Sequence, residues 1–237
     1  MQRREREYGL TRVEVIIGIL ILAVVAVLLN AAITSFATPA RRAEATSVVR
    51  NIVNAVKSYE ADYGHYPTVV EAAGLGEKPV CVGDPNCKIS VGPNRLLFDL
   101  LRAIPRGLNA GHLLNPRRTK YVEMELAKDR KNPRSGFADG STFSNAVQGC
   151  LFDPWGHQYC VAYKTDGSVG LDLSAVYSDL AGSEKMIPTS VAVFSLGNDG
   201  IVDGKDYPGR LCPPSEEHPN DVVSWKLPPR NAESGTQ

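Results

Sequence analysis

The hydrophobic pattern begins with an apolar run from Val13 to Ile33, in which only Glu14 and Asn30 are clearly polar. As an α-helix these 21 residues rise roughly 32 Å, about the thickness of the hydrocarbon core of a bilayer. Burying a carboxylate at the start of such an apolar segment costs free energy, so a carboxylate there usually has a partner. The pattern predicts a transmembrane helix with Glu14 as its candidate functional residue.

A second apolar pattern, with helical spacing, follows this run. Its members recur at alternating four- and three-residue steps, the spacing of a single helix face. They are Ala45, Val49, Ile52, Val56, Tyr59 and Tyr63. Gly64 is expected to end the helix. We therefore expect one long helix with an apolar first half and an amphipathic second half.

After Gly64 the pattern changes to short segments separated by Gly- and Pro-rich turns. Residues 95–104 predict a short helix, capped by Asn94 and stopped by Pro105. Alternating apolar residues predict several strands. They are 120–126, 157–163 and 190–196, with a last short piece at 221–225. The order of elements indicates an α+β fold, with a long N-terminal helix packed on a small antiparallel sheet.

Charge and composition argue against two classes of function. The chain has 26 basic and 26 acidic residues, so no global field steers it to nucleic acid. Basic residues gather between Arg117 and Arg134, but only Tyr121 interleaves them as a stacking residue. The four histidines lie in separate contexts, and the common catalytic motifs are absent. We expect neither nucleic-acid binding nor enzyme activity.

Three interpretations fit the N-terminus: a cleaved secretory signal, a plain signal anchor, and a prepilin-type leader. Ala37 or Ala40 loosely fits the cleavage site of a secretory signal. Neither of the first two interpretations gives Glu14 a partner. If a peptidase cuts after Gly9, Leu10 becomes the new terminus and Glu14 lies one helical turn from it. That carboxylate can then neutralise the terminal ammonium of a neighbouring helix in a staggered array.

On these residues the chain resembles the class III signal of type IV pilins and type II secretion pseudopilins. The resemblance rests on a short charged leader, Gly9, Thr11 and Glu14, while Leu10 stands where Phe is usual. Three further segments resemble those of pseudopilins. The helix end at 59–67 resembles that of pseudopilins in general. The Asp153–Gly156 turn with Tyr159, and the Ser195–Gly200 loop with Asp221 and Trp225, resemble the G-type branch, to which the segments together point.

The resemblance implies a pilin-like fold with four parts. Residues 1–9 are the leader, 10–36 the transmembrane and assembly helix, 37–227 the periplasmic globular domain with the amphipathic half of the helix, and 228–237 a loose tail. The implied location is the bacterial inner membrane, crossed once, with the globular domain in the periplasm.

The implied function is that of a structural subunit of a type II secretion pseudopilus. A membrane aspartyl peptidase cuts between Gly9 and Leu10 and methylates the new terminus, and subunits then stack into a short helical fibre that promotes protein export. The implied partners are further copies of the chain, this prepilin peptidase, minor pseudopilins, the inner-membrane assembly platform, and the membrane before assembly. Two alternatives stay open: a type IV pilus or DNA-uptake subunit, and a signal-anchored extracytoplasmic enzyme or binding protein.

A structural Ca²⁺ is the one cofactor candidate. The resemblance carries over to the Ser195–Gly200 loop and to Asn220 and Asp221, and Asp203 is added because Ca²⁺ takes six to eight oxygen ligands. The candidate ligands are the Leu196 carbonyl, Asp199, Asp203, Asn220 and Asp221. The competing interpretation is an ordinary loop, since Asp, Asn and Gly are common turn residues.

Five cysteines suit an exported protein, and an odd number leaves at least one thiol unpaired within the chain. A disulfide between Cys81 and Cys87 is favoured over a zinc site, because no His lies nearby. Cys150 and Cys160 flank the predicted hairpin turn almost symmetrically, which favours a second disulfide and leaves Cys212 unpaired.

Overall fold

The chain separates into two compact units, Met1–Arg41 and Arg42–Gln237. The computed structural model describes residues 12–69, 79–127, 129–165, 169–177, 186–201 and 221–226. Helix α1 (Arg12–Tyr63) contributes residues to both units. It ends where the sequence predicts, because Gly64 has a φ of +73° and its N–H donates to the Glu60 carbonyl at 2.7 Å.

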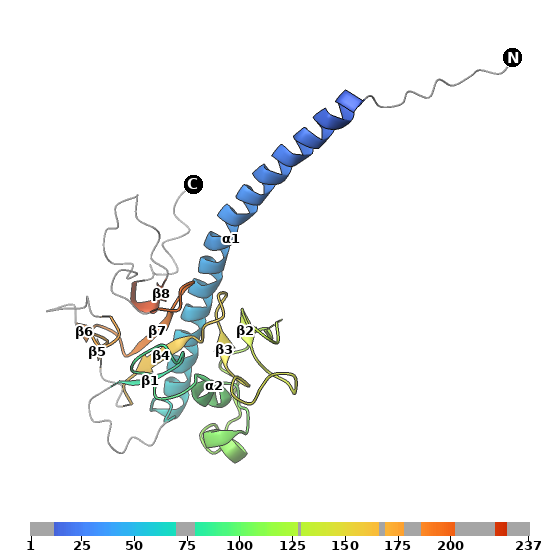
Figure 1. The fold of residues 1–237 in the computed structure, drawn as a ribbon. Coiled ribbons are helices and arrows are strands. Elements are labelled where there is room, and N and C mark those ends of the chain that lie inside the picture. Colours follow the sequence, from blue (N-terminus) through green and yellow to red (C-terminus); the bar gives the residue numbers. More distant parts are fainter. Residues whose placement is uncertain are drawn as a thin grey trace, which may run out of the picture. The chain divides into compact units, whose positions relative to one another are not determined.

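The described strands form one four-stranded sheet and two two-stranded sheets, all antiparallel (Figure 1). The largest sheet has the order β1-β4-β7-β8. Its strands are β1 (Val80–Val82), β4 (Cys160–Tyr163), β7 (Val191–Ser195) and β8 (Val222–Val223). The smaller sheets pair β2 (Gly136–Phe137) with β3 (Leu151–Phe152), and β5 (Leu171–Asp172) with β6 (Met186–Ile187).

Apolar side chains cover both faces of the largest sheet. Val161 and Val193, which pair across β4 and β7, belong to a core that also contains Ile52 and Val56 of α1. The neighbouring pair, Ala162 and Ala192, points to the opposite face and joins a second buried cluster. The predicted stripe of α1 is confirmed from Ala45 to Tyr59, whose members are buried in the first core.

Three short helices complete the described elements: α2 (Arg95–Leu101), η1 (Gly107–His112) and η3 (Ser224–Lys226). Asn94 precedes α2 as predicted, but its side chain makes no capping hydrogen bond. Its Nδ2 instead donates to the carbonyls of Leu151 and Tyr159 at 2.8 and 3.0 Å, and its Oδ1 accepts from the Leu151 N–H. Asn94 therefore ties the start of α2 to the sheet region.

The predicted pilin-like packing of one long helix on one small sheet is wrong in that form. The unit boundary after Arg41 separates the first part of α1 from the compact unit that contains the strands. The described strands form three sheets rather than one, because the Gly- and Pro-rich segments leave several strands only two residues long. The described residues form a mixed α+β arrangement.

The predicted transmembrane segment, residues 10–36, is also corrected. Side chains along α1 are described at positions 13, 15–25 and 39–63. A span needs roughly 20 consecutive apolar residues, and the described part of the chain contains no helix that is long and apolar enough. The same finding contradicts the predicted single-pass location in the inner membrane with a periplasmic domain.

The strand predicted at 120–126 is absent, although Val122 is buried as the alternation requires. Other contacts hold this segment. The Tyr121 N–H donates to the Leu101 carbonyl at 2.8 Å, and the Tyr121 hydroxyl donates to Asp62 at 2.7 Å. Hydrogen bonds to α2 and α1 therefore hold the start of this segment. Its end contacts the sheet through one isolated β-bridge, between Leu126 and Phe137.

Candidate functional site

The most exposed apolar residues of α1 lie in its first part. Ten large aliphatic side chains there are each between 43 and 69 % exposed. They are Val13, Val15, Ile16, Ile17, Ile19, Leu20, Ile21, Leu22, Val24 and Val25, and we call them the assembly face. Exposed apolar surface of this extent marks an interaction site, because water contact with each side chain costs free energy.

The processing residues Gly9 and Leu10 lie outside the described residues. Glu14 lies in the first turn of α1, next to the assembly face, and its side chain is not among those described. Its predicted role in pairing with a neighbouring terminus therefore stays a prediction.

Three of the five candidate calcium ligands are described, and the carboxylates of two of them, Asp199 and Asp221, accept hydrogen bonds within the protein. Oδ1 of Asp199 accepts the Ile201 N–H at 3.0 Å, which is the contact expected of an ordinary turn. Asp221 is fully buried, and its Oδ2 accepts the Tyr177 hydroxyl at 2.9 Å. Leu196 is buried in the second core.

The other two candidate calcium ligands, Asp203 and Asn220, lie outside the described residues. Within the described ranges, no three His, Cys, Asp or Glu side chains come together in a way that would hold a metal ion. The calcium site stays a prediction.

The Asp153–Gly156 turn is organised by one buried carboxylate. Oδ1 of Asp153 accepts the N–H groups of Trp155, Gly156 and His157 at 2.8–2.9 Å. Its Oδ2 accepts the Ser195 hydroxyl at 2.5 Å, which joins the turn to the end of β7. Burial raises the pKa of Asp153, while the bonds from Ser195 and the backbone oppose this shift. The sequence shows the turn, but not its contact with Ser195.

His157, the next residue after the turn, lies beside a second acidic group. Its Nδ1 is 3.6 Å from Oδ2 of Asp84, and the interaction raises the pKa of His157. Burial alone would raise the pKa of Asp84. However, His157 and the N–H groups of Asn86 and Gln158 outweigh burial and lower this pKa.

These opposite shifts predict the pH range in which the His157–Asp84 pair stabilises the fold. The folded pKa of His157 lies above its unfolded value of 6.5, so its contribution is complete below about pH 6.5 and is lost as pH rises through the folded pKa. The folded pKa of Asp84 lies below 3.8, so its contribution is complete above about pH 4 and is lost as pH falls through that lowered value.

Replacing His157 by Gln is therefore expected to lower the free energy of unfolding by about 1 kcal/mol between roughly pH 4 and 6.5. Urea unfolding of both proteins across pH measures this difference, which should shrink above pH 6.5. A difference that grows toward alkaline pH would contradict the pairing.

The structure brings together three of the four described cysteines. The Sγ atoms of Cys81 and Cys87 are 3.9 Å apart, and Cys160 belongs to the same buried cluster. Thiol hydrogen bonds from Cys160 and Cys81 lower the pKa of Cys87. The predicted Cys81–Cys87 disulfide is not formed, since both are free thiols, but the residues are neighbours as predicted.

The predicted Cys150–Cys160 disulfide is not supported. Cys150 lies in a separate buried cluster with Phe143 and Phe152, and both thiols are free. The Phe152–Gln158 bridge and the Tyr159 N–H, which donates to the Leu151 carbonyl at 3.3 Å, join the two segments. Beyond these contacts β3 pairs with β2 and β4 pairs with β7. Cys212 lies outside the described residues.

Mild oxidation by a small-molecule disulfide is expected to link Cys81 to Cys87 and to leave Cys150 reduced. The sulfur atoms of Cys81 and Cys87 are already 3.9 Å apart, so forming the bond between them requires little movement of the backbone. Peptide mapping after alkylation of the unfolded protein identifies the linked pair. Recovery of a Cys150–Cys160 peptide would contradict the clusters described above.

Comparison of the chain with protein-family models gave no match, and neither curated proteins nor solved structures matched it.

Proposed function

We propose that the chain is a structural subunit of a helical fibre of the type II secretion pseudopilus kind, which promotes protein export. The observation that supports this proposal is the assembly face, where ten aliphatic side chains are exposed along residues 13–25. Helices that are apolar on all sides are found surrounded by other apolar groups. In a fibre, those groups are the same helices of neighbouring subunits.

The free energy available from burying the assembly face is comparable with the cost of association. Fully burying one aliphatic side chain contributes about 1.5–3 kcal/mol. The ten exposed side chains are already partly covered, so their burial contributes on the order of 10 kcal/mol. Losses of translational, rotational and side-chain freedom oppose association by about 4–15 kcal/mol. Contacts with several neighbours, as in a helical array, are therefore needed for a stable fibre.

In the same proposal, Glu14 pairs with the amino terminus that cleavage after Gly9 creates. The new ammonium at Leu10 and the Glu14 carboxylate of an adjacent copy neutralise each other as the helices pack. Such a pair specifies register, because only one stagger brings the two charges together. The partners are further copies of the chain, minor subunits and a prepilin peptidase, of which the chain is the substrate; its own role is structural.

N-terminal mass spectrometry of the chain, expressed with and without a prepilin peptidase, tests the proposal. We expect a mature chain that begins at methylated Leu10 only when the peptidase is present. A chain that still begins at Met1 in the presence of an active peptidase would refute the proposal.

Replacing Glu14 by Ala is expected to leave this cleavage intact and to reduce fibre formation about tenfold or more, because the neighbouring ammonium loses its partner. The Glu60→Ala variant, which changes a carboxylate in the amphipathic part of α1, is the matched control. Counting fibres by negative-stain electron microscopy measures the effect. Normal fibres from the Glu14 variant would remove the pairing from the proposal.

A further inference from the structure

Three buried cysteines lie together on one face of the largest sheet. Cys81 of β1 pairs with Ala162 of β4, and two residues further along each strand Gly83 lies against Cys160. Residues two apart on a strand point to the same face, so Cys81 and Cys160 are diagonal neighbours on that face. Both belong to the second core together with Cys87, whose Sγ is 3.9 Å from the Sγ of Cys81.

Small residues leave space for these sulfur atoms. A Cβ added at Gly83 would lie 2.8 Å from the Cys160 Sγ, so any side chain there would displace the Cys160 thiol. Ala162, opposite Cys81, adds a single methyl group to the same face. The three thiols are therefore not held apart by larger side chains between the two strands.

Cys87 is carried by the loop that follows β1, residues 83–92, which we call the thiol loop. Its backbone folds back on the strand, because the Val91 N–H donates to the Cys81 carbonyl at 2.8 Å. The Cys87 N–H donates to the Asp84 carbonyl at 3.0 Å, which closes a turn within the loop. From this turn the Cys87 thiol points to the thiol of Cys81.

Two side chains fasten the thiol loop to the rest of its unit. Oδ2 of Asp84 accepts the Gln158 N–H at 2.9 Å, and Nδ2 of Asn86 donates to the Gly200 carbonyl at 3.1 Å. Cys87 is 2 % exposed while these bonds hold, although Asn86 beside it is exposed. A reagent therefore reaches Cys87 when the loop opens, and these two bonds determine how often it does so.

Negative charge in this cluster is favoured at Cys87. Thiol hydrogen bonds from Cys160 and Cys81 lower the pKa of Cys87 and outweigh its burial, and the N–H groups of Ile89 and Ser90 lower it further. The bond to Cys87 raises the pKa of Cys81, and burial raises that of Cys160. The thiolate is the nucleophile of thiol–disulfide exchange, so Cys87 reacts first and the other two thiols resolve the product.

We propose that the thiol loop is a redox switch, in which Cys87 forms a disulfide first with Cys81 and then, by exchange, with Cys160. The oxidant is a low-molecular-weight organic disulfide. The first bond ties the loop to β1, and the second ties it to β4. One oxidation therefore locks the loop onto the sheet and leaves one of the three thiols reduced.

The oxidation step conserves atoms and electrons. The Cys87 thiolate attacks the organic disulfide, forms a mixed disulfide and releases one thiolate, which takes the proton of Cys81. The Cys81 thiolate then attacks the Cys87 sulfur and releases the second thiolate. The two cysteines lose two electrons, and the organic disulfide is reduced to one thiol and one thiolate.

The exchange step involves no net oxidation. The Cys160 thiolate attacks the Cys87 sulfur, and the bond between Cys81 and Cys87 breaks as the bond between Cys87 and Cys160 forms. Cys81 leaves as a thiolate and takes the proton that Cys160 gave up. Both steps use Cys87, which is the thiol common to the two disulfides.

Oxidation of the full chain by glutathione disulfide tests the proposal. The parent protein for this experiment carries Cys212→Ser, so that the fifth thiol takes no part. Peptide mapping after alkylation of the unfolded protein follows the products with time. We expect the Cys81–Cys87 peptide first and the Cys87–Cys160 peptide later, with Cys150 alkylated throughout.

Three single variants of this parent identify the common thiol. Cys81→Ser is expected to form the Cys87–Cys160 disulfide directly, and Cys160→Ser is expected to stop at Cys81–Cys87. Cys87→Ser is expected to oxidise at least about tenfold more slowly, because the two remaining thiols have raised pKa values. Cys150→Ser is the matched control, since Cys150 lies in a separate buried cluster, and it should oxidise like the parent.

Loop opening supplies two further measurements. Asn86→Ala removes the bond to the Gly200 carbonyl and is expected to speed oxidation about fivefold, since the thiol loop opens more often. In the oxidised parent, the Val91 N–H is expected to exchange with solvent deuterium at least about tenfold more slowly than in the reduced parent. The disulfide keeps the loop closed and so protects this amide.

Three results would overturn the inference. They are the absence of a Cys87–Cys160 peptide from Cys81→Ser, oxidation of Cys87→Ser as fast as the parent, and equal exchange of the Val91 N–H in both redox states. Near-ultraviolet circular dichroism checks the folding of each variant, and the corresponding Ala variant replaces any Ser variant that lacks the spectrum of the parent. None of these results bears on N-terminal cleavage or fibre formation.

Discussion

Replacing Ile17, Leu20 and Val24 together by Asp is expected to abolish self-assembly of the chain. These residues follow one another at steps of three and four on α1, and each is more than half exposed. Each substitution removes an aliphatic side chain and places a charge where neighbouring helices would exclude water. The combined loss is on the order of 5 kcal/mol or more, which corresponds to at least a thousandfold weaker association.

Sedimentation velocity over a range of protein concentrations measures this effect. The control is Leu113→Asp, since Leu113 is 77 % exposed but lies after η1, outside the assembly face. Its sedimentation is expected to match that of the unmodified chain. The triple variant changes no residue of the Arg42–Gln237 unit, so the circular dichroism signals of its strands and aromatic side chains should persist. If the triple variant assembles normally, the assembly face has another role.

The elements that the sequence predicts well are those fixed by local pattern. The stripe from Ala45 to Tyr59 requires only helical spacing, and Gly64 ends α1 because it adopts a positive φ at low cost. Strand alternation also locates β4 and β7 to within a few residues. It does not show that both faces of these strands are buried, because small residues such as Ala162 and Ala192 give a weak apolar signal.

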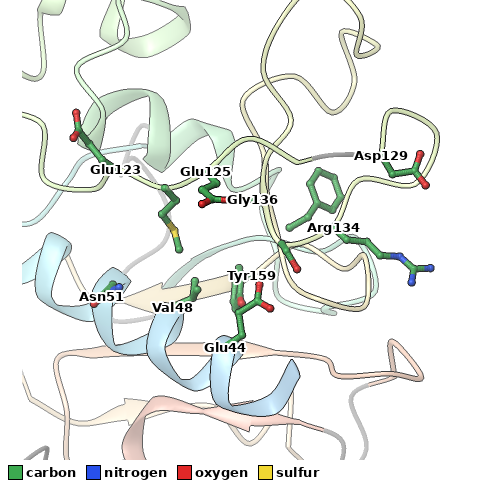
Figure 2. A pocket seen from close by; sticks show the side chains of 12 residues that line it. Glu44, Val48, Asn51, Glu123, Glu125, Asp129, Arg134, Gly136 and Tyr159 are labelled. Carbon is green, nitrogen blue, oxygen red and sulfur yellow. The ribbon is translucent and has the colours of Figure 1, made fainter. Parts of the chain in front are cut away.

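The parts that the sequence does not predict depend on contacts between distant residues. Asn94 reads as a helix cap, but its amide bonds Leu151 and Tyr159, which lie 57 and 65 positions away. Residues 120–126 alternate like a strand, but Tyr121 bonds α1 and α2, and the β contact is confined to Glu125 and Leu126 at the end of the segment. A pocket against α1 is lined by residues of α1, by residues of the segment that leads into β2, and by Phe152 and Tyr159 (Figure 2). No local pattern encodes such contacts, so only the folded chain reveals them.

Among these distant contacts, the bond between Asp153 and Ser195 has the largest expected effect on stability. The Asp153→Ala variant is expected to lose about 3–5 kcal/mol of the free energy of unfolding. It deprives three backbone N–H groups and the Ser195 hydroxyl of their acceptor, at a position that is fully buried. Urea unfolding at neutral pH measures the loss. Asp129 offers a matched control, because its carboxylate also accepts backbone N–H groups but is exposed, so Asp129→Ala should destabilise the chain far less than Asp153→Ala does.

The Asp153→Asn variant separates hydrogen bonding from charge at the same position. Its amide oxygen still accepts the backbone N–H groups, so it should retain much of the stability that Asp153→Ala loses. The folded pKa of Asp153 is raised above 3.8, so the folded chain holds this proton more tightly than the unfolded chain. The stability contributed by this group therefore falls as pH rises from about 3.8 through the folded pKa, and this decline is expected to be absent in Asp153→Asn. Equal losses for Asp153→Ala and Asp129→Ala would show that the buried carboxylate does not organise the turn.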